Sequence, residues 1–177
     1  MSTAMTIRPV QLTDAPALAG LLNAIIARGG TTALEDPFTP GQLASVLLAG
    51  PAVIGCVVAE DHAGALAGFQ SLTRSDTLPP DIGDIGTFVR LGHAQAGTGS
   101  RLFAATRGLA AARGLSAINA TIRADNAGGL AFYARLGFTD HGIQRAVPLR
   151  DGTPVDRISK RFALLRACDP PRPEAGA

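Results

Sequence analysis

The only tyrosine of the chain, Tyr133, follows Asn126 by seven residues, inside a segment whose pattern predicts a helix over residues 126–136. Seven residues are about two helical turns, so both side chains point to the same side of that helix. A phenol with an ordinary pKa of about 10 suits a general acid, and an amide can bind a polar ligand. Tyr133 can therefore meet whatever Asn126 binds. The alternative is a core aromatic that packs beside Leu136 and Phe138.

A second chemical feature is the sequence Gly-Thr-Gly-Ser at residues 97–100, between a predicted strand and a predicted helix. Glycines let the backbone approach a ligand closely, and the free N–H groups of a helix N-terminus suit a pyrophosphate. Arg101 and Arg107 can add positive charge nearby. The third glycine of a Rossmann fingerprint is missing, because Leu102 stands there, and the Gly-Lys-Ser/Thr of a Walker loop is absent. The segment is therefore a phosphate loop of another type or a tight turn.

The cysteines and histidines form no motif for a metal ion or a covalent nucleophile. Cys56 and Cys168 share no ligand spacing with His62, His93 or His141. No Ser-His-Asp or Cys-His set is evident in the sequence. We therefore expect no metal ion and no disulfide, and direct attack on a bound substrate is favoured over a covalent enzyme.

Composition limits the class of protein. The chain has 177 residues and a net charge of +2, with 46% hydrophobic and 17% charged residues. These values predict one domain, at residues 1–166, followed by a flexible tail at 167–177. No run of Lys or Arg suggests a nucleic-acid partner. There is no apolar signal core, and the apolar run 51–59 is too short to span a bilayer, so we expect a cytoplasmic protein without a membrane partner.

Hydrophobic periodicity and turn residues predict the elements that must position these groups. The predicted strands cover residues 7–10, 52–60, 66–73, 84–90, 116–123, 138–150 and 153–164. The predicted helices start at Thr13 or Asp14, at Thr39, at Gly97 and at Asp125 or Asn126. Because this order mixes hairpins with helical crossovers, it predicts a mixed sheet with helices packed on it.

Taken together, three patterns resemble the GNAT superfamily of acyl-CoA-dependent N-acyltransferases. They are the strand Asp-Ile-Gly-Thr-Phe-Val at 84–89, the glycine turn after it, and Asn-x6-Tyr-x3-Gly-Phe at 126–138. The resemblance spans residues 6–164, and within the superfamily the chain looks most like the phosphinothricin acetyltransferase-like branch, partly because of residues 29–37. It implies an α/β (α+β) fold with a mixed, mostly antiparallel seven-stranded sheet. Helices would cover both faces, and the fourth and fifth strands would splay apart.

The resemblance implies acetyl-CoA as the co-substrate, bound in that splay. The residues expected to contact it are Phe88, Val89, Gln95, Ala96, Gly97, Thr98, Gly99, Ser100, Arg101 and Asn126. Two positions depart from the family pattern. Ala94 stands where Arg or Gln is usual, and Gly129 replaces the more usual Ala or Ser three residues after Asn126.

The resemblance also implies the catalytic roles. Tyr133 would protonate the leaving thiolate, and Asp84 would remove a proton from the attacking amine in a ternary complex. Asp81 or a water chain is the alternative base, and Asp84 can also be an ordinary aspartate at the end of a loop. A main-chain N–H near Val89 would polarise the thioester carbonyl.

The acceptor is expected to be the primary amine of a small, amino-acid-like molecule. Thr31, Thr32, Glu35 and Arg74 are expected to line its side of the cleft, and Arg74 or Arg90 could bind a carboxylate. A homodimer is expected from the family. The alternatives are a protein or peptide N-acetyltransferase and a non-catalytic module that binds acyl-CoA or a partner.

Overall fold

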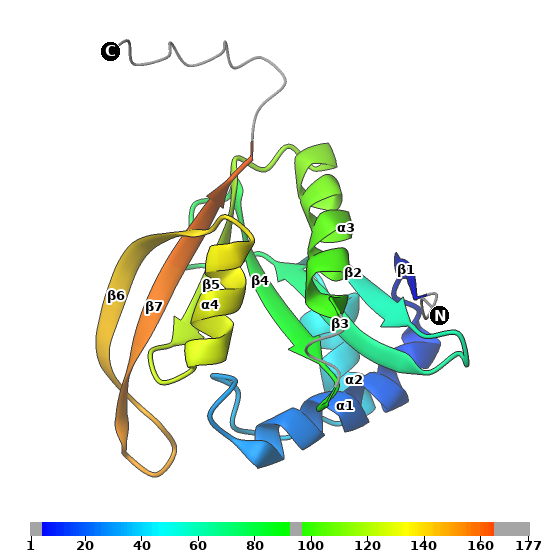
Figure 1. The fold of residues 1–177 in the computed structure, drawn as a ribbon, viewed down its shortest axis with the longest axis horizontal. Coiled ribbons are helices and arrows are strands. Elements are labelled where there is room, and N and C mark those ends of the chain that lie inside the picture. The colour runs from blue at the N-terminus through cyan, green and yellow to red at the C-terminus, as the bar shows by residue number, and fades with distance from the viewer. Residues whose placement is uncertain (1–4, 93–96, 165–177) are drawn as a thin grey trace.

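The computed structural model describes residues 5–92 and 97–164, and these residues form a seven-stranded mixed sheet with helices on both faces (Figure 1). The strands are β1 (Thr6–Pro9), β2 (Val53–Glu60), β3 (Leu66–Thr73), β4 (Ile82–Val89), β5 (Ala117–Arg123), β6 (Thr139–Pro148) and β7 (Pro154–Ala163). The helices are η1 (Leu12–Asp14), α1 (Ala15–Arg28), α2 (Pro40–Leu43), η2 (Ala44–Leu48), α3 (Thr98–Ala112) and α4 (Ala127–Arg135).

The strands lie in the order β1-β2-β3-β4-β5-β7-β6, and all neighbours are antiparallel except β4 and β5. The parallel pairing of β4 with β5 begins at Ile82 opposite Ala117 and ends at Asp84 opposite Asn119. Beyond that point β4 continues to Val89, paired with β3 alone among the described strands. The two strands therefore separate as a fork, which confirms the predicted splay (Figure 1).

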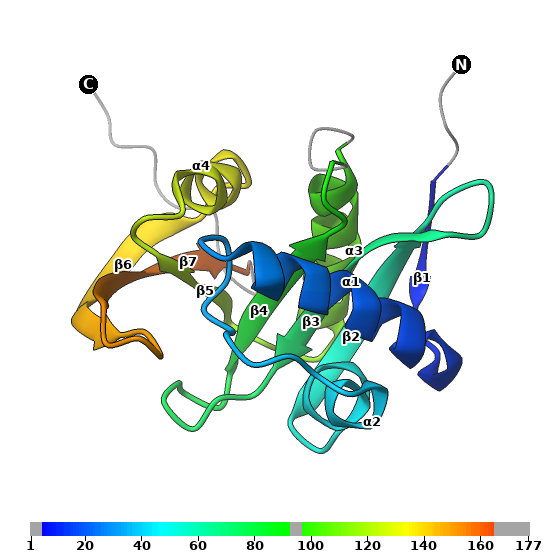
Figure 2. The same ribbon diagram turned by 90° about the horizontal axis from the view of Figure 1, so that it is seen from below.

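Two helical layers cover the sheet, α1 and α2 on one face and α3 and α4 on the other (Figure 1, Figure 2). Leu18 and Leu22 of α1 are fully buried in a cluster with Phe69 of β3. On the opposite face, the rings of Phe103 and Phe138 lie 5.3 Å apart in the cluster that α3 and α4 share. Burial of these apolar side chains stabilises both layers. No helix within the described ranges is long and apolar enough to cross a membrane.

The order of strands and helices agrees with the sequence prediction, apart from the additional 3-10 turn η1 before α1, and two further details differ. The second predicted helix is a single α-helical turn, capped by Thr39, that continues as the π-helical turn η2. The N–H of Ala49 donates to the carbonyl of Ala44, five residues earlier, and this bond closes the π turn. Strand β4 begins at Ile82 rather than at the predicted Asp84, because residues 82–84 are the part that pairs with β5.

Candidate active site

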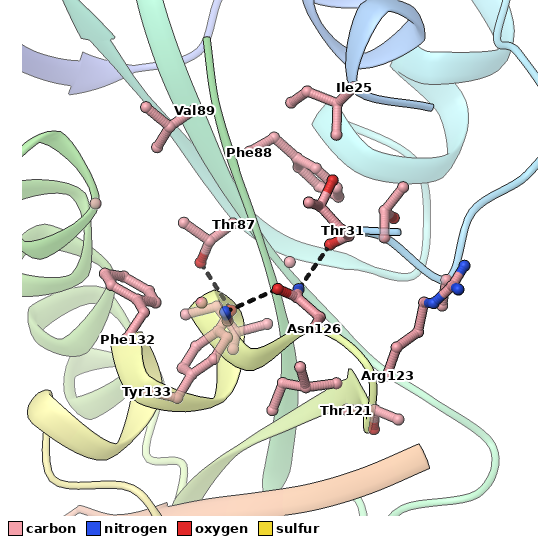
Figure 3. Close-up of a pocket in the computed structure, with 18 of the residues that line it drawn as sticks. Ile25, Thr31, Thr87, Phe88, Val89, Thr121, Arg123, Asn126, Phe132 and Tyr133 are labelled. Atoms are coloured by element: carbon pink, nitrogen blue, oxygen red, sulfur yellow. Dashed lines mark hydrogen bonds between the residues drawn. The ribbon is translucent and has the colours of Figure 1, made fainter. Parts of the chain in front are cut away.

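A cavity of about 960 Å³ lies at the fork between β4 and β5 (Figure 3). The end of α1 and the loop after it line one side, together with β4 and the start of α3. Side chains of β5, α4, β6 and β7 line the other side. Groups that stand far apart in the sequence therefore face one space.

Asp84 lies at the vertex of the fork and lines the cavity. Burial raises the pKa of its carboxyl, and the opposing effects of Asn119 and Arg161 are smaller. Asn119 donates from Nδ2 to Asp84 Oδ1 at 2.8 Å, while its own Oδ1 accepts from Arg161 Nε at 3.1 Å. Because both ends of the Asn119 amide are engaged, its orientation is fixed. The result is a half-buried carboxylate with a raised proton affinity that faces the cavity.

Tyr133 projects from α4 to the free arm of β4, and its hydroxyl lies 2.8 Å from Thr87 Oγ1 (Figure 3). Thr87 Oγ1 also accepts from Gln70 Nε2 at 2.9 Å. The side chain is buried, and burial raises the pKa of its phenol above the ordinary value. Tyr133 therefore stays protonated through the neutral pH range and can donate its proton to a base within the cavity.

Asn126 caps the N-terminus of α4 and also ties that helix to the loop after α1. Its Oδ1 accepts the N–H of Gly129 at 2.9 Å, and its Nδ2 donates to the Thr31 carbonyl at 2.9 Å (Figure 3). A Cβ at residue 129 would lie 2.5 Å from that Nδ2. The glycine at this position, which departs from the family pattern, therefore gives the Asn126 amide the room it occupies.

The glycine turn contributes three of its predicted residues to the cavity, namely Gly97, Gly99 and Ser100. Gly97 caps α3 with φ at 72°, in the left-handed region that favours glycine. A Cβ at Gly99 would lie 2.8 Å from the Phe132 ring, so this glycine lets α3 and α4 approach each other. Gln95 and Ala96, which were also predicted to bind the cofactor, lie outside the described residues.

Two residues predicted to bind the cofactor do not line the cavity. Thr98 is fully buried, and its Oγ1 has no hydrogen-bond partner among the described residues. Arg101 instead donates from Nη2 to the Met5 carbonyl at 2.7 Å. Phe88 and Val89, which were predicted to contact the cofactor arm, do line the cavity.

The predicted acceptor residues separate into two pairs. Thr31 and Thr32 line the cavity. Arg74 and Glu35 do not, because both are engaged elsewhere: Arg74 Nη1 donates to the Pro80 carbonyl at 3.3 Å, and Glu35 accepts the Arg150 N–H at 3.1 Å. Glu35 thus holds the loop after α1 against the β6–β7 hairpin.

The other residues weighed in the sequence also have definite places. Arg90 lines the cavity, but its guanidinium donates to the Leu66 carbonyl, at 3.0 Å from Nε. Asp81, the alternative base, does not line the cavity, and its carbonyl accepts the Ser116 N–H at 2.8 Å. Of the two carboxylates considered as the base, Asp84 is therefore the one that faces the cavity.

Sequence reasoning missed Thr87, Asn119 and Arg157. Asn119 is 2% exposed between the apolar residues of β5, and Arg157 is 7% exposed in β7. A polar side chain at an inward-facing position of a strand is the signal that could have found both. Thr87 stands within the strand motif 84–89, and its role depends on Tyr133, which is 46 residues away.

Comparison with known proteins matches residues 30–138 to the acetyltransferase (GNAT) family. A phosphinothricin acetyltransferase from Sinorhizobium meliloti, solved in complex with acetyl-CoA, is 21% identical with a TM-score of 0.81, covering 99% of this chain and 95% of that one. A GCN5-related N-acetyltransferase from Kribbella flavida is 21% identical with a TM-score of 0.79, covering 91% and 98%. A ribosomal-protein-alanine N-acetyltransferase from Brucella melitensis is 20% identical with a TM-score of 0.76, covering 90% and 99%. The search of curated proteins finds no match.

Proposed function

Because the chain belongs to the GNAT acetyltransferase family, we propose that it transfers an acetyl group from acetyl-CoA to the primary amine of a small, amino-acid-like molecule. The observation that carries this proposal is one cavity faced by both Asp84 and Tyr133. Acetyl transfer to an amine needs a base and an acid, because the ammonium form must lose a proton and the leaving thiolate must gain one. Asp84 suits the first role and Tyr133 the second.

Acetyl-CoA is proposed to enter along the free arm of β4. The edge of residues 85–89 that faces β5 pairs with no strand among the described residues, so its main-chain groups are free for a ligand. Gly97, Gly99 and Ser100 face the cavity at the N-terminus of α3, where N–H groups and the helix dipole suit a pyrophosphate. Asn126 lies across the cavity from this arm (Figure 3). These residues fit a long ligand with phosphates at one end.

Asp84 is proposed to accept the proton that leaves the amine nitrogen as that nitrogen attacks the thioester carbonyl carbon. Its raised pKa increases its affinity for this proton, and Asn119 holds its carboxylate in place. A water molecule can stand between Asp84 and the amine without changing this role. The reaction forms the amide bond and breaks the C–S bond in one ternary complex, with no covalent enzyme intermediate.

Tyr133 is proposed to give its proton to the departing sulfur. Gln70 occupies one acceptor position of Thr87 Oγ1, which leaves the Thr87 hydroxyl proton available for the Tyr133 oxygen. In that arrangement the phenolic proton points to the cavity. Loss of this proton is eased because Thr87 still donates a hydrogen bond to the phenolate that forms.

The direct test is acetyl transfer over a panel of small amines and short peptides, read as thiol release and as acetylated product by mass spectrometry. We expect product from small primary amines and none from the peptides. Isothermal titration with CoA is the second measurement. Binding of CoA without any product would favour the non-catalytic module, product from peptides alone would favour a protein acceptor, and no CoA binding would overturn the proposal.

We further propose one catalytic domain at residues 1–166, a cytoplasmic location and a homodimer. The exposed strand β6 forms an edge of the sheet that a second copy could cover. Light scattering coupled to size exclusion gives the mass of the particle and tests the homodimer. A mass equal to one chain across micromolar concentrations would contradict it.

A further inference from the structure

Two arginines lie side by side on the cavity wall formed by the last strands. Arg123 of β5 is directly opposite Arg157 of β7, and Gln144 of β6 is opposite Arg157 on its other side. The two arginines are only 8% and 7% exposed, and all three residues line the cavity. Two buried guanidinium groups at adjacent strand positions repel each other unless anions offset their charge.

The protein supplies an anion for Arg123 but leaves Arg157 incompletely bonded. Asp125 accepts from Arg123 Nε at 2.8 Å and from Arg123 Nη2 at 2.6 Å. Arg157 Nη1 is buried and has no hydrogen-bond partner within the described part of the chain. A buried donor of a charged group without a partner costs free energy in the empty protein, and a bound anion would remove that cost. Arg157 therefore lines the cavity with a guanidinium group of which one buried nitrogen has no partner among the described residues.

The position of this charge separates it from the phosphate end of the cavity. The glycine turn lies beyond Val89 on the free arm of β4, whereas Arg123 and Arg157 lie on β5 and β7, which form the other arm. Figure 3 shows Val89 and Arg123 on opposite sides of the pocket, with Thr87 and Asn126 between them. A group bound at Arg157 therefore belongs to the molecule on the acceptor side.

On the premise of the proposed acetyltransferase function, we infer that Arg157 binds a carboxylate of the amine acceptor and selects acceptors that carry one. The guanidinium presents donors in a planar fork that matches the two oxygens of a carboxylate. Asp125, Glu35 and Asp151 already offset part of the positive charge of the two arginines, so the site suits a monoanion better than a dianionic phosphate. Arg74, the arginine that sequence reasoning assigned to this role, is tied to Pro80 and does not face the cavity.

A bulge in β6 brings a further polar group to this site. The register of β6 shifts between Gln144 and Val147, and Ala146 within the bulge has φ at 52°. Residues three apart in a regular strand face opposite sides, whereas the bulge lets both Gln144 and Val147 line the cavity. The Gln144 amide can then donate to the same carboxylate that Arg157 binds.

The kinetic test compares each α-amino acid with its α-amide, which keeps the amine and the side chain and removes the negative charge. We expect the native protein to prefer acids, and Arg157→Gln to lower kcat/KM for acids by about 10- to 100-fold, mainly through KM. Rates with the amides should stay unchanged in Arg157→Gln, and Arg157→Lys should restore part of the loss with acids. Arg145→Gln is the matched control, because Arg145 is an exposed arginine of β6 that pairs with Asp156 and does not line the cavity.

A binding test does not depend on turnover. N-acetylglycine and N-acetylglycinamide are titrated into the CoA-loaded protein while the arginine Nε–H resonances are followed by NMR, with the Arg157 signal assigned from its absence in Arg157→Gln. We expect a saturable shift of that signal in the millimolar range with the acid and none with the amide. Arg145→Gln should titrate like the native protein.

The two tests separate failure of this site from failure of the proposed function. A shift of the Arg157 signal without any acetyl transfer would support the carboxylate site and contradict the acetyltransferase assignment. Acetyl transfer with equal rates for acids and amides, or an Arg157 signal that the acid does not move, would overturn the role of Arg157 and leave the acetyltransferase standing. A fall of equal size for acids and amides in Arg157→Gln would mean a structural role only.

Discussion

Strands β3 and β6 belong to the same sheet, but their side chains meet opposite environments. Seven of the eight residues of β3 are buried, whereas nine of the ten residues of β6 are exposed. Helices cover both faces of β3, and its side chains fill the apolar core. Strand β6 lies at the edge of the sheet and carries polar side chains. We call β1–β4 with α1–α3 the core half and β5–β7 with α4 the polar half, after the exposed strand β6, although β5 and α4 also contribute Ile118 and Tyr133 to a buried apolar cluster with α3.

The candidate active site lies where these halves separate, and each of its central contacts joins one half to the other. Asp84 of the core half meets Asn119 of the polar half, and Thr87 meets Tyr133. The core half thus supplies the proposed base, Asp84, while the polar half supplies the proposed acid, Tyr133, and the two arginines of the cavity wall. Substitutions at these contacts test whether the meeting of the two halves explains function.

Tyr133→Phe removes the hydroxyl that joins α4 to β4 and keeps the buried ring. We expect kcat to fall by about 10²- to 10⁴-fold, the range for loss of a general acid or base. CoA affinity, measured by isothermal titration, should change little, because the ring packing is kept. An unchanged kcat would show that this contact joins the two halves without serving the chemistry.

Asp84→Asn keeps the shape of the side chain and its contact with Asn119 but removes the base. We expect kcat to fall by about 10²-fold or more at neutral pH. In the native protein the rate should fall as pH drops through the raised pKa of Asp84, because the base must be unprotonated. If the rate of Asp84→Asn fell with decreasing pH in the same way as the rate of the native protein, the base would have to be another group.

The same substitution should raise stability. Burial raises the pKa of Asp84, so the folded protein holds that proton more tightly than the unfolded chain does. Stability contributed by the protonated form is present below the ordinary aspartate pKa of about 3.9 and is lost as pH rises through the raised pKa. Asp84→Asn should therefore have a higher Tm than the native protein at neutral pH, and the difference should vanish in acid. A lower Tm of Asp84→Asn at neutral pH would show that burial of the charged Asp84 carboxylate does not destabilise the native protein.

Gly99→Ala tests the backbone contact between α3 of the core half and Phe132 of the polar half. The added Cβ would lie 2.8 Å from the Phe132 ring, so we expect a loss of about 1–3 kcal/mol in the free energy of unfolding and weaker CoA binding. Gly108→Ala is the matched control in the same helix, because it is exposed and its Cβ meets nothing within 4 Å. That control should gain about 0.5–1 kcal/mol in denaturant unfolding. Equal effects of the two substitutions would mean that the packing of α3 against α4 does not require a glycine at residue 99.

Ala146→Gly tests the bulge of the polar half and has the smallest expected effect. Ala146 has φ at 52°, in the region that glycine adopts without a Cβ penalty, so the substitution should stabilise the fold by about 1 kcal/mol. Ala163→Gly is the control, an exposed strand position without a positive φ, and it should lose about 0.5–1 kcal/mol. Denaturant unfolding measures both. A loss in Ala146→Gly would mean that the bulge holds no backbone strain.

Several features follow from the sequence alone because they depend on nearby residues. The order of strands and helices is encoded in apolar periodicity and in turn residues such as Gly152. Helix α4 begins directly after Asn126 because that side chain caps its first turn. Because Asn126 and Tyr133 are seven residues apart, both side chains lie on the side of α4 that faces the cavity. The glycine turn before α3 was also recognisable, since Gly97 adopts a positive φ that few other residues tolerate.

The contacts between residues that are far apart in the sequence are determined by the tertiary structure. Strand β7 inserts between β5 and β6, and this order places Arg157 beside Arg123 and Gln144. The partners of Tyr133 and Asn126 lie 46 and 95 residues away, and the register of the sheet determines them. Local patterns act over a few residues, whereas strand order and register are selected by burial summed over the whole core. For that reason the resemblance in the sequence indicated the proposed acid and base, and the fold was needed to find the arginine proposed to select the acceptor.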